Sequence, residues 1–204
     1  MKNLQVNDNT LAADDATKFL ITFPNLLKVD VSESSISCFF RLKLFRNVEF
    51  LRAQVTVHTL EEDFSATKFL NLTHMELRFK EEYYWDWLIK FICACPSLQS
   101  LAIHKIRWGY GLLSDDDDKN WLHPQFVPEC FSSQLQMFSF INYTGNESEL
   151  QFIKYIIQNA TVLRSVKIYR NTSSNPPEEQ RQMIEELYLC QRGSVLRQPH
   201  FEWM

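Results

Sequence analysis

The chain has 204 residues, of which 45% are hydrophobic, enough to bury one sizeable domain or two small ones and too many for a largely disordered chain. Its formal net charge is −4 and it has no block of basic residues, so composition argues against a nucleic-acid binder. Only four glycines are present, two of them (Gly109 and Gly111) in one loop, which disfavours folds built on glycine-dependent phosphate loops.

The first residues carry no export signal. MKNLQVNDNTLAADD has no apolar run of signal-peptide length, and no stretch of the chain approaches a membrane span. The five cysteines are odd in number and lack the rhythm of a disulfide scaffold, which suits a reducing compartment. We therefore expect an intracellular protein, cytoplasmic or nuclear, with no membrane partner. The secreted alternative rests on five possible glycosylation triplets, at Asn71, Asn142, Asn146, Asn159 and Asn171.

One apolar pattern recurs along the chain. Leu72, Met75 and Leu77 have the L-x-x-L-x-L spacing of a leucine-rich repeat. Six segments fit it, and they start at Leu26, Phe50, Leu72, Leu98, Leu135 and Leu163. These starts are 24, 22, 26, 37 and 28 residues apart, and all but one interval lies near the range of about 20 to 29 expected for such repeats. Each segment is predicted to be a strand.

Helices are expected between these strands, where apolar residues recur at helical spacing. The first helix is predicted on YYWDWLIKFICA, with Tyr84, Leu88 and Phe91 or Ile92 on one face. The second is predicted on ESELQFIKYIIQNA, and Asn146 with Glu149 three residues later resembles a capping box at its start. A third is predicted on PPEEQRQMIEELYLC.

Two tryptophans and one long interval need separate interpretation. Trp85 and Trp87 are two residues apart on a predicted helix, so we expect one of them to be exposed or covered by the loop from Trp108 to Trp121.

The 37-residue interval holds KIRWGYGLLSDDDDKNWLHPQFVPECF, which breaks the periodicity. Its acidic run, Asp115 to Asp118, lacks the alternating ligands and the turn glycine of a calcium loop, so we interpret it as a solvated loop tip.

The C-terminal half of the sequence resembles a plant family, the F-box proteins that carry leucine-rich repeats followed by an FBD domain. The resemblance covers residues 71–194 and rests on LTHMELRF, CPSLQSLAIHK, WLHPQFVPECFSSQLQMFSFINYTGNESELQFIKYIIQNATVLRSVKI and LYLCQRGS. It implies that the repeats present a substrate protein, while an F-box docks on the adaptor subunit of a cullin-type ubiquitin ligase. No LP-x-x-x-L segment precedes ATKFLITFPNLLKVDV, so the adaptor is an expected partner only if an F-box lies upstream.

Together these patterns predict an α/β leucine-rich-repeat solenoid, with parallel strands on the concave face and helices on the convex face. A C-terminal FBD-type cap of strands and helices completes it. We expect a leucine-rich-repeat region over residues 1–106, an insertion loop over 107–131 and FBD-like repeats and cap over 132–204.

The residues between the core leucines are expected to line the concave face, because side chains alternate between the two faces of a strand. Ten of them form the predicted partner-binding set: Arg52, Gln54, His74, Glu76, Arg78, His104, Met137, Ile141, Lys167 and Tyr169. Their mixed charge suits a protein or peptide better than a phosphate backbone. The alternative is that they are merely solvated strand positions.

Catalysis and metal binding find little support in the sequence. His74, His104 and Glu76 on neighbouring strands raise the question of zinc or a general base, but zinc needs three or four convergent ligands. Cys93 and Cys95 have C-x-C spacing, for which buried packing is the expected role. We expect no catalytic residue, cofactor or metal site. The function expected is non-catalytic protein recognition, as in the substrate-binding part of an F-box subunit; the alternative is a truncated member acting as a free binding module.

Overall fold

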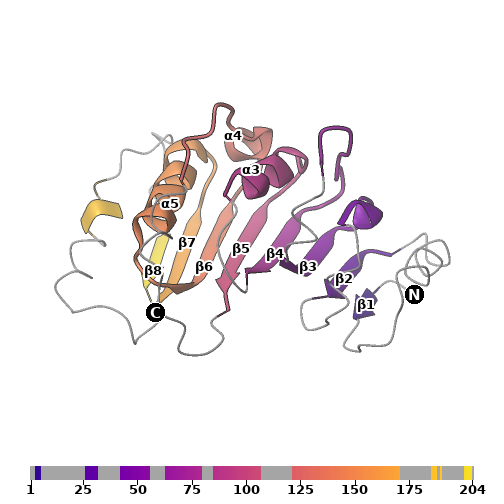
Figure 1. Ribbon diagram of the computed structural model, residues 1–204, viewed down its shortest axis with the longest axis horizontal. Helices are drawn as coiled ribbons and strands as arrows, with labels where there is room; N and C mark the ends of the chain where they lie inside the picture. The colour runs from indigo at the N-terminus through magenta and orange to yellow at the C-terminus, as the bar shows by residue number, and fades with distance from the viewer. Residues whose placement is uncertain are drawn as a thin grey trace.

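The computed structural model of the protein describes residues 3–5, 26–31, 42–55, 63–79, 85–106, 121–170, 185–187, 189 and 200–203. They form one eight-stranded sheet in which every neighbouring pair is parallel, and the strands follow one another in the sheet in chain order (Figure 1). The strands are β1 (Asn3–Gln5), β2 (Lys28–Val31), β3 (Phe50–Val55), β4 (His74–Phe79), β5 (Ser100–Lys105), β6 (Met137–Tyr143), β7 (Ser165–Arg170) and β8 (His200–Trp203).

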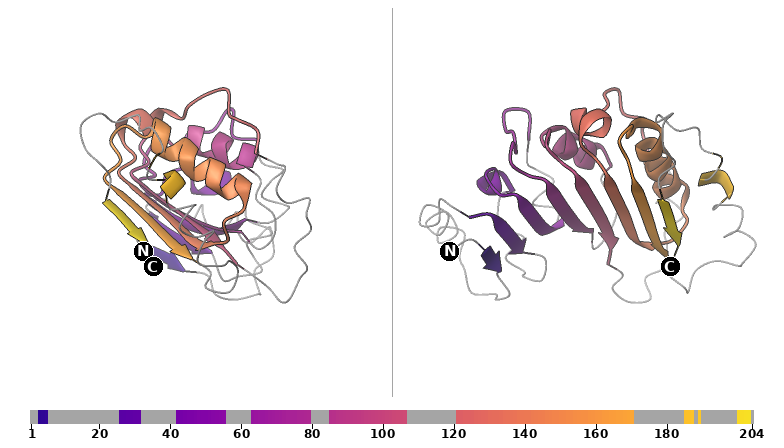
Figure 2. Two further views of the ribbon diagram at one scale, coloured as in Figure 1. Left: turned by 90° about the vertical axis from the view of Figure 1, so that its left-hand side faces the viewer. Right: turned by 180° about the vertical axis from the view of Figure 1, so that it is seen from behind.

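The helical elements of the described residues lie on one face of this sheet, and none of them lies on the other, which we call the open face (Figure 2). They are the 3₁₀ helix η2 (Leu42–Phe45) and the α-helices α3 (Trp85–Cys93), α4 (Glu129–Ser133) and α5 (Glu147–Asn159). Residues 185–187 and 189 are also helical, and Leu187 among them is fully buried. None of the described helices is long and apolar enough to cross a bilayer.

The same backbone contact recurs where the strands β3 to β7 begin. The carbonyl of the residue after the first apolar position of one unit accepts hydrogen bonds from two successive N–H groups of the next unit. In β4, for example, Thr73 and His74 both donate to the Glu49 carbonyl, at 3.0 and 3.1 Å. The equivalent acceptors elsewhere are Leu27, Thr73, Gln99 and Gln136. Five consecutive units therefore enter the sheet in the same way.

The core lies between the sheet and the helices. Apolar strand residues facing the helices are buried, and the residues that alternate with them face away, as in the buried-intermediate alternation of β4 and β5. Every unit buries its leucine positions against its neighbours. The six predicted strands correspond to the consecutive strands β2 to β7. The predicted α/β class with parallel strands and helices on one side is thus confirmed.

One predicted repeat start is wrong. Phe50 pairs with His74, so the residue equivalent to Leu72 is Val48, not Phe50. The unit reads V-x-x-L-x-A, in which the small Ala53 fills a position that is Leu77 in the next strand. With Val48 as the start, the first two spacings are 22 and 24 residues, matching the separations of Asp30 from Arg52 and of Glu49 from Thr73.

The expectation for the two tryptophans is only half right, because both are buried, Trp85 at 3% exposure and Trp87 at 7%. Trp87 packs against rings of the preceding unit, among them Phe64 at 5.7 Å between centroids. Trp85 points toward the following unit, stacks on Phe152 at 4.6 Å and is covered edge-on by Trp121 at 5.9 Å. Opposite sides of this helix therefore contact different neighbours in the stack, and both sides are core.

The two central helices, α3 and α5, lie where they were predicted, and the cap of α5 is confirmed. The Asn146 side chain accepts a hydrogen bond from the Glu149 N–H at 2.8 Å. Tyr84 and residues 107–120, which include the acidic run of the insertion, lie outside the described residues. The boundaries of the three predicted regions stay a prediction.

Candidate functional site

The open face is the side of the sheet that the helices leave uncovered. In the described strands β2 to β7 its residues are Lys28, Asp30, Phe50, Arg52, Gln54, His74, Glu76, Arg78, Ser100, Ala102, His104, Met137, Ser139, Ile141, Ser165, Lys167 and Tyr169. All ten predicted partner-binding residues are among them. Gln54 differs from the rest, since it is only 6% exposed and offers little surface to a partner.

A charge ladder crosses four adjacent strands of the open face. Its members, Asp30, Arg52, Glu76 and His104, alternate in sign when the histidine is protonated. The Arg52 guanidinium bridges two carboxylates: Nη1 lies 2.9 Å from Asp30 Oδ2, and Nε lies 2.7 Å from Glu76 Oε2. His104 Nε2 lies 3.0 Å from the other oxygen of Glu76. Parallel pairing in register makes this possible, because it places Asp30, Arg52 and Glu76 side by side.

Glu76 is the centre of the charge ladder. Burial alone would raise the pKa of its carboxyl group, but the hydrogen bonds from His104 and Arg52 outweigh that effect and lower the pKa to about 2. Arg78 Nε is 3.6 Å from the same carboxylate and adds a third basic neighbour. Glu76 therefore stays ionised at any physiological pH and fixes the orientation of the bases around it.

Phe50 lies on the open face beside the charge ladder, although it was not among the predicted partner-binding residues. Two cations flank its ring: Lys28 Nζ is 6.0 Å and Arg52 Cζ is 5.7 Å from the ring centroid. Both distances suit a cation–π contact. The repeat pattern assigns Phe50 to the first apolar position of its unit, and hence to the core, so the two-residue slip in β3 also hid this residue.

The predicted set divides into two groups across the sheet. Ala102 on β5 and Ser139 on β6 lie between Glu76 and Lys167, at the same level of the sheet. On β6 the apolar Met137 is 44% exposed. The open face thus offers a charged end on β2 to β5, and at its other end Met137 and Ile141 of β6 beside Lys167 and Tyr169 of β7.

The two histidines are not brought together as a catalytic or metal pair. His74 is opposite Ser100, whereas His104 is opposite Arg78, so they occupy different levels of neighbouring strands. His74 Nδ1 lies 2.9 Å from the hydroxyl of Thr73. Within the part of the chain that the structure describes, no group of three or more His, Cys, Asp or Glu residues is arranged to hold a metal ion.

Glu149 has a structural role that capping alone did not predict. Its carboxylate is fully buried and accepts the backbone N–H groups of Thr144 and Gly145, at 2.8 and 3.1 Å. Lys105 Nζ reaches it from the end of β5 at 3.1 Å. Asn142, with φ of 63° at the irregular end of β6, donates to the Lys105 carbonyl at 2.7 Å. These contacts tie β5, the β6–α5 turn and α5 together.

Three described cysteines have free thiols, and two of them are buried. Burial raises the pKa of Cys95 and raises that of Cys130 to about 12, so neither is a thiolate at neutral pH. The packing role was expected of Cys93 and Cys95; Cys95 lies in the core, and the partly buried Cys93 packs against it. Cys93 is the last residue of α3, and Cys95 follows the helix.

Comparison with known proteins finds a matching family and several similar plant proteins. The FBD family matches residues 123–168, from the segment before α4 to β7. An F-box/FBD/LRR-repeat protein of Arabidopsis thaliana is 29% identical over 147 residues, covering 68% of this chain and 35% of that protein. A second protein so named, from the same plant, is 35% identical over 101 residues, covering 49% and 22%.

An FBD-associated F-box protein of the same plant is 29% identical over 131 residues, or 61% of this chain and 31% of the relative. The chain thus spans about a third of the length of curated relatives that it matches. No solved structure matches it. The FBD match over residues 123–168 and these relatives show that the chain is similar to the plant F-box/FBD/LRR-repeat proteins.

Proposed function

We propose that this chain is a non-catalytic protein-recognition module, built as a leucine-rich-repeat solenoid whose open face is the concave binding surface. The observation that carries the proposal is the charge ladder: a row of alternating charges held side by side on in-register strands, with an aromatic ring at one end and apolar residues at the other. Such a surface combines fixed charges with apolar contact area, which suits a folded protein or a peptide.

The partner class follows from the charges that are already paired. Arg52 and Glu76 satisfy each other within the protein, so the face does not present the uninterrupted row of cations that a phosphate backbone requires. A protein partner can instead place its own acid near Lys28 and its apolar side chains over Met137 and Ile141. This supports protein recognition over binding to nucleic acid.

In the cell, we infer that the recognised protein is a substrate for a cullin-type ubiquitin ligase. The support is the family: the relatives are named as F-box proteins, and the resemblance assigns adaptor docking to the F-box and substrate presentation to the repeats. The proposed setting is intracellular, cytoplasmic or nuclear.

A triple substitution tests the binding surface. Arg52→Ala, Glu76→Ala and Lys167→Ala together remove charges from both ends of the open face while leaving the core residues unchanged. The matched control carries Arg46→Ala, Glu129→Ala and Arg164→Ala, three exposed charges of the same signs outside the open face. In pull-downs from plant extract read by mass spectrometry, the control is expected to keep the wild-type partners and the open-face variant to lose them. Identical partner sets for all three proteins would refute the assignment.

A free binding module without ligase association is the alternative function. Co-purification with the adaptor subunit separates the two, because the F-box is the part of the family that contacts the adaptor. The 204-residue chain alone is expected not to retain the adaptor. Stoichiometric retention would contradict that expectation and place an adaptor contact within these residues.

A further inference from the structure

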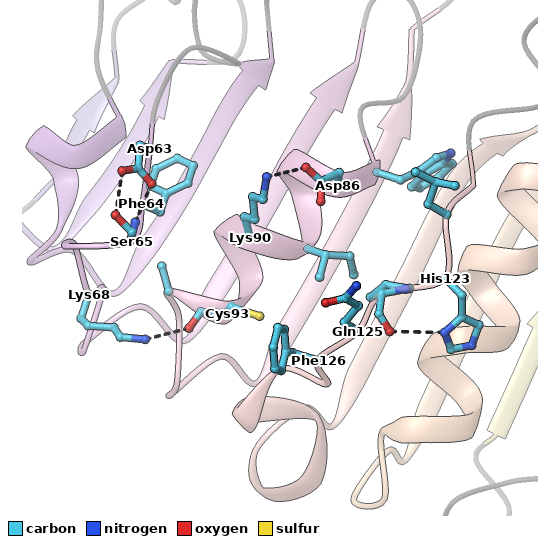
Figure 3. A pocket seen from close by; sticks show the side chains of 15 residues that line it. Asp63, Phe64, Ser65, Lys68, Asp86, Lys90, Cys93, His123, Gln125 and Phe126 are labelled. Atoms are coloured by element: carbon cyan, nitrogen blue, oxygen red, sulfur yellow. Dashed lines mark hydrogen bonds and ion pairs between the residues drawn. The ribbon is translucent and has the colours of Figure 1, made fainter.

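A pocket of about 680 Å³ lies on the helix-covered side of the sheet, away from the open face (Figure 3). Three segments that are distant in sequence form it: residues 63–68 ahead of β4, the helix α3, and residues 122–126 ahead of α4. We call it the α3 pocket. Residues 123–126 of its last segment fall within the FBD match, so the pocket joins the FBD region to the preceding repeat.

The α3 pocket has an apolar floor and an exposed apolar rim. Phe64, Trp85 and Ile89 line it and are buried in the core. On the rim, Leu122 is 80% exposed and Phe126 is 76% exposed. Large apolar side chains gathered at the mouth of a pocket are typical of an interaction site. A rim this exposed leaves the pocket open on one side, which suits a segment laid across it better than an enclosed small molecule.

Contacts with α5 hold this rim in place. The Phe126 carbonyl accepts a hydrogen bond from the Tyr155 hydroxyl at 3.0 Å, and the His123 ring meets the Tyr155 ring edge-on at 5.6 Å. Just before them, Trp121 packs edge-on against Phe152 at 5.9 Å. Because α5 anchors the segment at these points, the exposed side chains are positioned before any partner arrives, which lowers the entropic cost of binding.

The charges around the α3 pocket favour an acidic partner at one end. Lys90 forms an ion pair with Asp86 at 2.5 Å, and Asp63 accepts hydrogen bonds from Ser65 (Figure 3). Lys68 is exposed, and its contact among the described residues is with a neutral acceptor, the Cys93 carbonyl, at 3.1 Å. An ammonium group has three donors, so Lys68 retains the capacity to bind a carboxylate.

We propose that the α3 pocket binds a peptide segment of a partner protein, with an aromatic or large aliphatic side chain over the apolar floor and a carboxylate against Lys68. The site is separate from the open face and does not depend on its proposed role. Its chemistry predicts a short motif in which an apolar anchor lies a few residues from Asp or Glu.

Phage display tests this proposal and does not require the partner to be identified first. A library of random peptides, about 12 residues long, is panned on the wild-type protein, with counter-selection on the Leu122→Ser/Phe126→Ser variant. Both substituted residues are exposed, so the fold is expected to survive, and circular dichroism checks it. The enriched peptides are then synthesised and titrated by fluorescence anisotropy against the wild type, the rim variant, Lys68→Glu and the control Arg46→Glu, which reverses an exposed charge outside the pocket.

Enriched peptides are expected to pair an apolar anchor with an acid, and to lose at least about tenfold in affinity on Lys68→Glu and on the rim variant but not on the control. Peptides that bind all four proteins equally, or that lack acids, would overturn the proposal. So would sedimentation showing a wild-type dimer that the rim variant loses, since a second copy would then be the occupant. A synthetic peptide of residues 108–118, WGYGLLSDDDD, tests whether a segment of this chain is the occupant of the pocket. If it binds more tightly than every selected peptide, the proposal of a separate partner protein is also overturned.

Discussion

Replacing Glu149 by glutamine is expected to destabilise the protein more than any other single change to a charged residue described above. Its carboxylate is fully buried and contacts Lys105 Nζ and two backbone N–H groups. Removing one partner of a buried ion pair costs about 3–5 kcal/mol, because the other charge is left unpaired. Glutamine keeps the volume and one acceptor oxygen, so we expect a loss of about 3 kcal/mol, a large share of the roughly 5–15 kcal/mol that stabilise a domain.

The assay is urea unfolding at pH 7, followed by far-UV circular dichroism. Glu147→Gln is the matched control, since Glu147 is an exposed acid in the same first turn of α5 and contacts Gln151. Its loss removes a favourable charge near the helix N-terminus and is expected to cost at most about 1 kcal/mol. The difference between the two variants therefore isolates the buried contacts from the helix dipole.

A double substitution separates the ion pair from the backbone hydrogen bonds. Lys105→Met alone leaves the Glu149 carboxylate buried with its N–H donors, whereas Lys105→Met with Glu149→Gln removes both charges. The double variant is expected to lose less than the sum of the single losses, with a coupling of about 1–3 kcal/mol. If Glu149→Gln costs less than about 1 kcal/mol more than Glu147→Gln, the buried carboxylate does not hold β5, the turn and α5 together as described.

Three further outcomes are expected. The pKa of Glu76 is lowered in the folded protein, so the ionised Glu76 side chain stabilises the fold fully above the ordinary value of 4.5, and this stabilisation is lost as pH falls toward 2. The urea midpoints of the wild type and of Glu76→Gln should therefore differ less at pH 3 than at pH 7. Phe152→Ala removes the ring that stacks on Trp85, and should cost about 3–5 kcal/mol and shift tryptophan emission. Cys95 and Cys130, kept protonated by burial, should react with a thiol reagent at pH 8 only after unfolding, and rapid native reaction would contradict their burial.

The strands could be predicted because the information that specifies them is local. Each unit carries its own L-x-x-L-x-L spacing, and side chains that alternate at period two indicate a strand wherever they occur. The wrong repeat start in β3 has the same cause, because the pattern is judged from local spacing alone. Val48 and Ala53 are smaller than the residues usual at these positions, so the larger Phe50 fitted the pattern better, and only pairing with β4 shows which residue is equivalent to Leu72.

The contacts between units could not be predicted in the same way. The Lys105–Glu149 pair joins residues 44 apart, and Asp30 and Arg52 are 22 apart in sequence. A sequence pattern places each residue on a face but does not say which strand lies beside it or at what level. For Trp85 and Trp87 the period-3.6 argument correctly placed them on different sides of α3, but it could not show that both sides meet a neighbouring unit.

The two proposed surfaces occupy opposite layers of the same units, so their variants should be separable. The open-face triple change removes Arg52 together with Glu76, which avoids leaving two carboxylates facing each other across β3, as Arg52→Ala alone would. Its effect on the core is expected to be small, because Arg52, Glu76 and Lys167 alternate with the buried residues of their strands and so lie on the face of the sheet opposite the core. A triple variant that loses its pulled-down partners but still binds the selected acidic peptides, beside a Lys68→Glu variant that does the reverse, would establish two independent sites. Joint loss of both activities in either variant would mean that one surface acts through the other.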